Sequence, residues 1–321
     1  MSLRLWLRPE KFVSLYGTTP PRADASEDAV VRAADRLAER VRGLSLDGLV
    51  VYDVQDEAGR TLAPRPFPFL PTAEPREYSR RLRELTGKPT VTYKCVADMT
   101  EARWASWLTE TRRDYGIDHL SLVGLPSSRG VTSTLSLPRA MRVATAHPAN
   151  FTLGGVVIAE RHGQGRSESR RMLQKAADGC SFFISQAVYD AETTIRLLVD
   201  YVRDCAQEGV TPQRVILTFV PCGRAKTLEF IRWLGITIAE STATAILADA
   251  TPLRKSIAIC CDHLRAILSQ SYTRTIPLGL NIESVSIYKD EIDASIELHH
   301  ALHELVWEFG LERSGNRNVS S

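Results

Sequence analysis

The chain has 321 residues, of which 44% are hydrophobic and 24% are charged, so it can bury one large core or two ordinary ones. This balance excludes extensive disorder. Lysine and arginine number 40 against 38 aspartate and glutamate, a net charge of +2, which gives no electrostatic reason to expect a nucleic acid or a membrane as partner.

Short apolar runs rich in β-branched residues recur along the chain, and each is followed by a longer amphipathic stretch. This alternation is typical of parallel strands joined by crossover helices. In chain order, the runs predict strands over residues 12–16, 48–52, 90–94, 119–123, 152–158, 181–185, 215–219 and 278–285.

The amphipathic stretches between these runs predict the helices. Thr100 and Glu101 have the residue types of an N-cap and an acidic first turn, and Gly209 has that of a helix end. We expect helices over residues 26–42, 75–86, 100–115, 136–147, 166–178, 191–208, 224–234 and 288–309, with extra helices over 240–248 and 252–270.

Eight βα units favour an α/β fold of the closed (β/α)₈ TIM barrel type, with the extra helices before the last strand. An open, doubly wound sheet is the alternative. No linker rich in Pro, Gly or Ser divides the chain. We therefore expect a single barrel domain over residues 1–310 and a disordered tail over residues 311–321.

The cysteines and histidines predict no metal site. The six cysteines show no zinc-site spacing and are expected to be buried thiols. His299 and His303 are four residues apart but lack the Glu of a metal-binding HExxH helix, so we expect them on an outer helix. No apolar run reaches the length of a signal core or a membrane span, which predicts a cytoplasmic protein.

Three carboxylates follow the second predicted strand within five residues: Asp53, Asp56 and Glu57. In a barrel, side chains just past the strand ends converge on one pocket. Mutual repulsion and burial can raise the pKa of one carboxyl in such a cluster, so we expect these three to act as the catalytic acid group. The alternative is a solvated acidic loop paired with Arg60 or Arg65.

Other strand ends predict substrate-binding residues. Gln186 ends an almost wholly apolar strand, and its amide can make a two-point hydrogen bond to a heterocycle; the alternative is a Gln that caps a neighbouring loop. The further substrate-binding residues expected from their positions are Tyr16, Gln55, Tyr189, Asp190 and Glu283.

A second group of residues is predicted to bind a cofactor. Neither GxGxxG nor GxxxxGK[ST] is present, so loops of the barrel would have to hold a nucleotide. Arg171 and Lys175, one helical turn apart, could pair with a diphosphate, although such residues are usually solvated. The strand ends and loops add Lys94, Gly124, Glu160 and His162, the last of which could equally make a structural hydrogen bond.

Two segments resemble a known family. They are Gly154-Gly-Val-Val-Ile-Ala-Glu160-Arg-His162 and Ala177-Asp-Gly-Cys-Ser-Phe-Phe-Ile-Ser-Gln186-Ala-Val-Tyr-Asp190, with Lys175 on the helix between them. They are similar to the Pro-Glu-x-His and Gly-Ala-x-Phe-x-x-Thr-Gln-x-Phe-Phe-Asp segments of the methylenetetrahydrofolate reductase barrel. Weaker matches at Pro20-Pro21-Arg22, Pro221 and Leu280-Asn281 extend the likeness from Phe12 to Phe309.

The resemblance implies a TIM barrel, often oligomeric and so a candidate homo-oligomer. It implies that FAD passes a hydride from NADH or NADPH to a tetrahydrofolate derivative, the small-molecule substrate. By the same resemblance, Gln186 binds the pterin ring, and His162 and Lys175 lie along FAD.

The chain departs from the family in three places. The family's general acid, a Glu shortly before Pro-Pro-Arg, is absent from the segment Ser14 to Thr19. The family's Arg-Gly-Asp reads Val123-Gly124-Leu125, so the flavin motif is only partly retained, and Cys222 stands where an aromatic residue is expected after Pro221. Since a proton donor must activate the folate, the three carboxylates after the second strand are the expected substitutes.

The sequence thus predicts a divergent methylenetetrahydrofolate reductase-like oxidoreductase. Two alternatives remain open. One is a folate-dependent transferase that hands the one-carbon unit to another acceptor, since changed site residues alter chemistry before they alter fold. The other is a catalytically silent barrel that binds folate or partners an active homologue.

Overall fold

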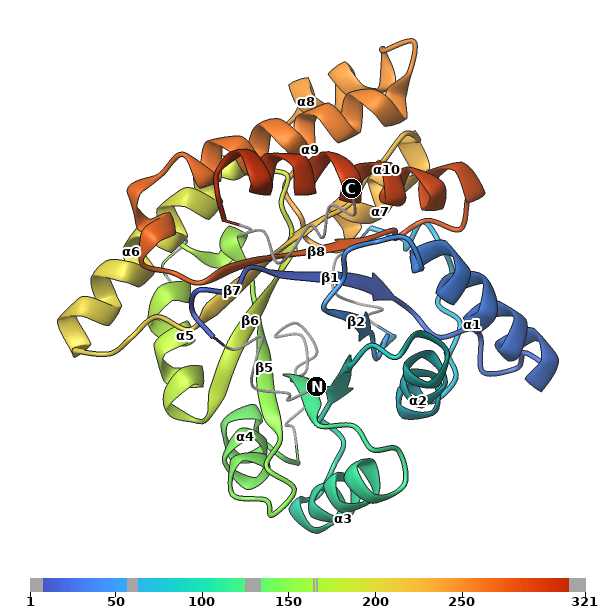
Figure 1. Cartoon of the computed structure of the whole chain (residues 1–321), viewed down its shortest axis with the longest axis vertical. Coiled ribbons are helices and arrows are strands. Elements are labelled where there is room, and N and C mark those ends of the chain that lie inside the picture. Colours follow the sequence, from blue (N-terminus) through green and yellow to red (C-terminus); the bar gives the residue numbers. More distant parts are fainter. Residues whose placement is uncertain (1–7, 57–62, 125–133, 164, 166, 312–321) are drawn as a thin grey trace, which may run out of the picture.

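Eight parallel strands close into a barrel at the centre of the described part of the chain, and helices surround it (Figure 1). The computed structural model describes residues 8–56, 63–124, 134–163, 165 and 167–311. The strands follow one another in chain order, and the last pairs with the first. The TIM barrel prediction is confirmed, and the open-sheet alternative is wrong.

The strands lie close to their predicted positions. They are β1 (Val13–Thr18), β2 (Gly48–Val51), β3 (Thr90–Cys95), β4 (His119–Val123), β5 (Thr152–Val157), β6 (Cys180–Ala187), β7 (Arg214–Phe219) and β8 (Leu278–Glu283). The first strand runs two residues past the predicted end at Tyr16, so Gly17 and Thr18 also belong to it.

The helices also match the predicted pattern. They are α1 (Glu27–Val41), α2 (Pro75–Thr86), α3 (Glu101–Arg113), α4 (Leu137–Thr145), α5 (Glu168–Ala177), α6 (Ala191–Glu208), α7 (Ala225–Trp233), α8 (Glu240–Leu247), α9 (Pro252–Leu268) and α10 (Lys289–Glu308). Two 3₁₀ turns, η2 (Ala159–Arg161) and η3 (Ser271–Arg274), complete the described elements. No described helix combines the length and the apolar composition that a membrane span requires.

Side chains alternate between the barrel interior and the layer under the helices. Val13, Leu15, Phe182 and Ile216 belong to an interior apolar cluster. Their neighbours on the same strands, such as Tyr16 and Phe183, belong to the main core between the barrel and the helices. This period of two determines which residues at the carboxyl ends of the strands face the mouth of the barrel.

The extra helices precede β8, as predicted. Helix α9 packs against both α6 and α10, while α8 lies farther out (Figure 1). Residues of α7 and α8 form a second apolar cluster with Tyr189, Val220 and Cys222, which follow β6 and β7. This cluster supports the loops at the carboxyl ends of those two strands.

Leu311, the first residue of the predicted tail, is the last residue that the structure describes. Leu311 packs against the main core, and its backbone N–H donates to the carbonyl of Val306 at 3.1 Å. The rest of the predicted tail, residues 312–321, lies outside the described residues.

Candidate functional site

A polar network occupies the mouth of the barrel at the carboxyl ends of β2, β7 and β8. The Asn281 amide donates to the Tyr52 hydroxyl at 2.9 Å and to the Thr218 hydroxyl at 3.2 Å, and lies 3.4 Å from a carboxylate oxygen of Glu283. These residues come from strands far apart in sequence. The closed barrel brings them together at the rim where TIM barrels carry their active sites.

Glu283 is the partly buried carboxyl of this network. Burial raises its pKa, and hydrogen bonds to Tyr52 and Asn281 oppose that effect only in part. A carboxyl in such surroundings can stay protonated at higher pH than one in water and can therefore donate a proton.

Two amide oxygens near the mouth lack hydrogen-bond donors among the described residues. Gln186 donates through its side-chain nitrogen to the carbonyl of Leu234 at 3.3 Å, while its oxygen is buried without a partner. The side-chain oxygen of Asn281 is also buried without a hydrogen-bond partner among the described residues. Buried polar atoms are nearly always paired, so these oxygens mark a place where a ligand with N–H or O–H groups can bind.

Aromatic and aliphatic side chains lie below the polar network. The rings of Tyr52 and Tyr93 meet edge to face, with centroids 4.7 Å apart, and Tyr52, Val123 and Val156 pack on the interior apolar cluster. The mouth thus combines an apolar base with a few polar groups, which is the usual make-up of a small-molecule site.

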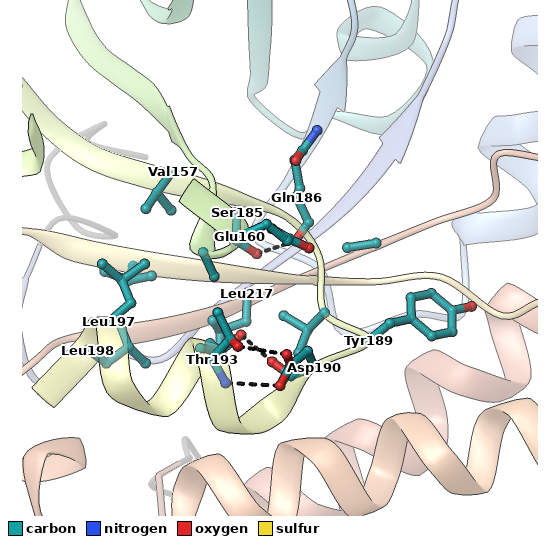
Figure 2. Close-up of a pocket in the computed structure, with 15 residues that line it drawn as sticks. Val157, Glu160, Ser185, Gln186, Tyr189, Asp190, Thr193, Leu197, Leu198 and Leu217 are labelled. Carbon is teal, nitrogen blue, oxygen red and sulfur yellow. Dashed lines mark hydrogen bonds between the residues drawn. The ribbon is translucent and has the colours of Figure 1, made fainter. Parts of the chain in front are cut away.

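A separate cavity of about 20 Å³ lies between β6, β7 and α6, on the outer side of the barrel wall. Tyr189, Asp190 and Leu197 are among the residues that line it, and Gln186 borders it while its side chain points away from Tyr189 and Asp190 (Figure 2). A volume of this order holds about one water molecule. The cavity is too small for a folate.

Asp53 of the predicted acid group is a structural acceptor. Its carboxylate accepts hydrogen bonds from the backbone N–H of Cys95 and from the Gln55 amide, both at 2.8 Å, and lies 3.5 Å from the Lys94 ammonium. Asp56 is exposed, and Glu57 lies outside the described residues. The predicted group is therefore not gathered around the mouth network in the part that the structure describes.

Three of the predicted substrate-binding residues point away from the barrel interior. The Tyr16 hydroxyl lies 2.7 Å from the Ser295 hydroxyl of α10, and the Tyr189 hydroxyl donates to the Val220 carbonyl at 2.7 Å.

Asp190 caps α6 by accepting from the backbone N–H of Thr193 at 2.9 Å. Burial acts to raise the pKa of Asp190, but the hydrogen bonds from Thr193 outweigh it, so the pKa is lowered. Gln186 and Glu283 remain at the mouth.

Lys175 and Arg171 of the predicted cofactor group lie on the outer side of the barrel wall. The partly buried Lys175 ammonium donates to the Val156 carbonyl and lies 3.9 Å from Glu168, and burial lowers its pKa. Arg171 lies 3.4 Å from the same carboxylate. Both cations are thus engaged by Glu168, which is fully buried.

The other predicted cofactor residues are dispersed around the rim. His162 contacts Asp200 of α6 at 2.8 Å, and the Lys94 ammonium lies 5.7 Å from the Trp107 ring centroid. Glu160 accepts from the backbone N–H of Thr237 at 3.4 Å, and burial raises its pKa. Gly124 ends the described part of its loop. These residues do not form one cluster.

Two residues in the described part of the loop between β2 and α2, Ala63 and Arg65, contact α7. The Arg65 guanidinium lies over the rings of Phe230 and Trp233, 5.3 and 4.8 Å from their centroids. The indole of Trp233 donates to the Ala63 carbonyl at 3.2 Å. The Arg65 guanidinium thus packs on aromatic rings of α7 by cation–π contacts.

Sequence reasoning missed Tyr52, Thr218 and Asn281 as site residues. The signal lies in the strand periodicity: in Gly279-Leu-Asn281-Ile-Glu283, the two polar residues are two apart, so they share one face of an otherwise apolar strand. Polar residues on the inner face of a barrel strand are candidates for the site in their own right.

One solved structure is similar to this chain over nearly its whole length. It is an uncharacterized protein from Clostridium thermocellum that binds two copies of 5-methyl-5,6,7,8-tetrahydrofolic acid. The two chains are 32% identical with a TM-score of 0.80, and the match covers 94% of this chain and 98% of that one.

A second solved structure, a 2,3-dimethylmalate lyase of the PEP mutase/isocitrate lyase superfamily, is 9% identical with a TM-score of 0.46. That match covers 99% of this chain and 90% of the lyase. No protein-family model and no curated protein matches the chain.

Proposed function

This chain belongs to the same family as the Clostridium thermocellum protein, and on that premise we propose that it binds a reduced folate at its barrel mouth. The observation that carries the proposal is the pair of buried amide oxygens, of Gln186 and Asn281, that lack donors among the described residues. A pterin ring presents several N–H groups along its edges, and an amide oxygen is a suitable acceptor for them.

The resemblance to the methylenetetrahydrofolate reductases supports the same ligand by a different route. It assigns pterin binding to Gln186, whose side chain points away from the small outer cavity and is held by the Leu234 carbonyl. The edge-to-face pair Tyr52 and Tyr93 supplies apolar surface for a flat ring.

The proposed reaction is reduction of a folate-bound one-carbon unit, with a reduced nicotinamide as hydride donor. We include no flavin in it. The side chains that would lie along FAD, His162 and Lys175, are occupied by Asp200, Glu168 and the Val156 carbonyl, so they do not fit a flavin diphosphate without breaking buried contacts.

Transfer of the one-carbon unit to another small acceptor is the second candidate. The observation that favours it is the same misfit of the flavin residues, since a transferase needs folate and acceptor but no hydride carrier. Consumption of NADH with methylenetetrahydrofolate would support reduction, while loss of methyl from 5-methyltetrahydrofolate only in the presence of an acceptor would support transfer.

Calorimetric titration with 5-methyltetrahydrofolate tests the binding proposal. We expect Gln186→Ala to weaken binding about fivefold, the effect of losing one hydrogen bond of about 1 kcal/mol. Gln174→Ala is the matched control, because it removes the same amide from an exposed position of α5. The absence of any heat of binding for the wild-type protein, or equal binding by both variants, would contradict the proposal.

A further inference from the structure

The end of β1 lacks a carboxylate, but the neighbouring strand brings one to the same place. Gly17 pairs with Glu283 in the barrel, and a Cβ built on Gly17 would lie 2.8 Å from a Glu283 carboxylate oxygen and 2.9 Å from the Tyr52 ring. A side chain at residue 17 would therefore clash with Glu283 in its present position. The glycine leaves the space that the glutamate of β8 fills.

The surroundings of Glu283 suit a carboxyl that exchanges a proton. The Tyr52 hydroxyl and the Asn281 amide both hydrogen-bond to it, and no cation of the described part of the chain is among the groups that act on its pKa. An uncharged, partly buried environment favours the protonated form, whereas an adjacent lysine or arginine would have favoured the carboxylate. Asp53, by comparison, lies beside Lys94.

We propose that Glu283 donates the proton that activates the bound folate, in place of a carboxylate on β1. This inference rests on the proposed function, because it assumes that the folate binds beside Gln186 and Asn281. Tyr52 is then a positioning residue, which holds the carboxyl through its hydroxyl and is itself held by Asn281 at 2.9 Å.

The step balances for a methylene-bridged folate. The Glu283 carboxyl gives its proton to the bridging nitrogen N10, and the bond from N10 to the methylene carbon breaks with its electron pair on N10. The N5 lone pair forms a double bond to the methylene carbon, which then accepts hydride from a reduced nicotinamide. The nicotinamide is oxidised, the product carries an N5 methyl group, and the carboxylate regains a proton from water.

Glu283→Gln separates the acid role from folate binding. We expect the variant to bind 5-methyltetrahydrofolate within about threefold of wild type, because the amide keeps the size and hydrogen-bonding ability of the side chain. Its turnover of methylenetetrahydrofolate with NADH should fall by about 10²–10⁴, the usual contribution of a general acid. Glu297→Gln, at an exposed position of α10, is the matched control.

The pH dependence of turnover distinguishes an acid role of Glu283 from a structural one, because a structural residue would not shift the pH profile. Activity should fall as pH rises through the raised pKa of Glu283, and this limb should vanish in Glu283→Gln. Tyr52→Phe should move the limb to higher pH, because the Tyr52 hydrogen bond lowers the Glu283 pKa. Tyr16, Tyr52 and Tyr93, the titratable groups that act with Glu283, have raised pKa values and stay neutral over this range.

The outcomes distinguish this inference from the proposed function. Wild-type protein that fails to bind the folate overturns both. Wild-type protein that binds the folate but consumes neither folate nor NADH overturns the acid role and leaves the binding proposal standing. Glu283→Gln with wild-type turnover and an unchanged pH profile also overturns the acid role alone, and it would direct attention to Asp56 or Glu57.

Discussion

Asp53 accepts a hydrogen bond from the backbone N–H of Cys95 at 2.8 Å, which ties the loop after β2 to the end of β3. The neighbouring contact to Lys94 adds an ion pair at 3.5 Å. The Asp53 carboxylate thus fastens one strand end to the next at the barrel rim.

Asp53→Ala should therefore lower the free energy of unfolding by about 1–3 kcal/mol, because it leaves a backbone donor without its acceptor. Urea unfolding monitored by circular dichroism measures this effect. Asp35→Ala, at an exposed position of α1, should change stability by no more than about 0.5 kcal/mol. Equal stability of the two variants would mean that the Cys95 contact contributes nothing measurable.

The proposal that Asp56 or Glu57 is the acid can be tested beside Glu283. If Glu283 is the donor, Asp56→Asn and Glu57→Gln should keep full turnover in the folate assay, since the proton then comes from Glu283. A fall of about 10² or more in either variant, with folate binding retained, would instead support the acidic loop.

Gly17→Ala tests the close approach of β1 and β8. The added methyl would lie within 3.0 Å of Glu283 and Tyr52, so those side chains must move, at a cost of about 1–3 kcal/mol for an overpacked site. We expect turnover to fall more than folate affinity does. Gly43→Ala, where nothing lies within 4 Å of the added atom, is the control and should behave like wild type in a thermal melt and in the assay.

Buried His299 makes stability depend on pH. Burial is the largest cause that lowers its pKa to about 3, and the neighbouring His303 and His300 lower it further. The unfolded chain takes up a proton on this residue near pH 6.5, while the folded chain does so only near its own pKa. Its contribution to stability is thus fully present above about pH 6.5 and is lost as pH falls towards 3.

The free energy of unfolding should change with pH by at most about 1.4 kcal/mol per pH unit on account of His299. Urea unfolding at a series of pH values should show a smaller slope for His299→Gln than for wild type. His300→Gln, at an exposed position of the same helix, should change the slope much less, because it removes only a minor cause of the lowered His299 pKa. Identical slopes in all three proteins would show that His299 does not titrate as its burial implies.

Lys175→Met distinguishes a structural lysine from a flavin-binding one. Removing the ammonium leaves the Val156 carbonyl without this donor and the buried Glu168 with one cation fewer, so we expect a loss of about 1–3 kcal/mol in stability. The visible absorption spectrum of the purified protein should be the same for wild type and variant. A yellow wild-type protein and a colourless variant would support flavin binding by Lys175.

The alternation of apolar runs and amphipathic stretches was enough to predict the barrel. Both bounds of α2 agree with the prediction, because Pro75 begins the helix and Gly87, in the left-handed conformation, ends it. Gln186 and Glu283 were predicted near the site since polar residues at the ends of apolar strands are conspicuous.

The sequence was less informative about the direction in which individual side chains point. Tyr16 is predicted as the last residue of its strand, but the strand continues to Thr18. The alternation of side chains places Gly17 on the interior face and Tyr16 against α10. Position in the chain also did not show that the long side chain of Lys175 reaches the Val156 carbonyl under the helix layer. Such outcomes depend on the register and depth of the folded strands, which periodicity alone does not give.

The second apolar cluster has a consequence for ligand selectivity. Gln186 is held through the carbonyl of Leu234, at the end of α7, and α7 packs with α8 in that cluster. Substitutions at buried positions of α8, such as Ala243 and Ile246, can therefore alter the orientation of the Gln186 amide without touching any strand. Related barrels can diverge in the heterocycle they accept through mutations in an outer helix, while the eight-stranded framework stays constant.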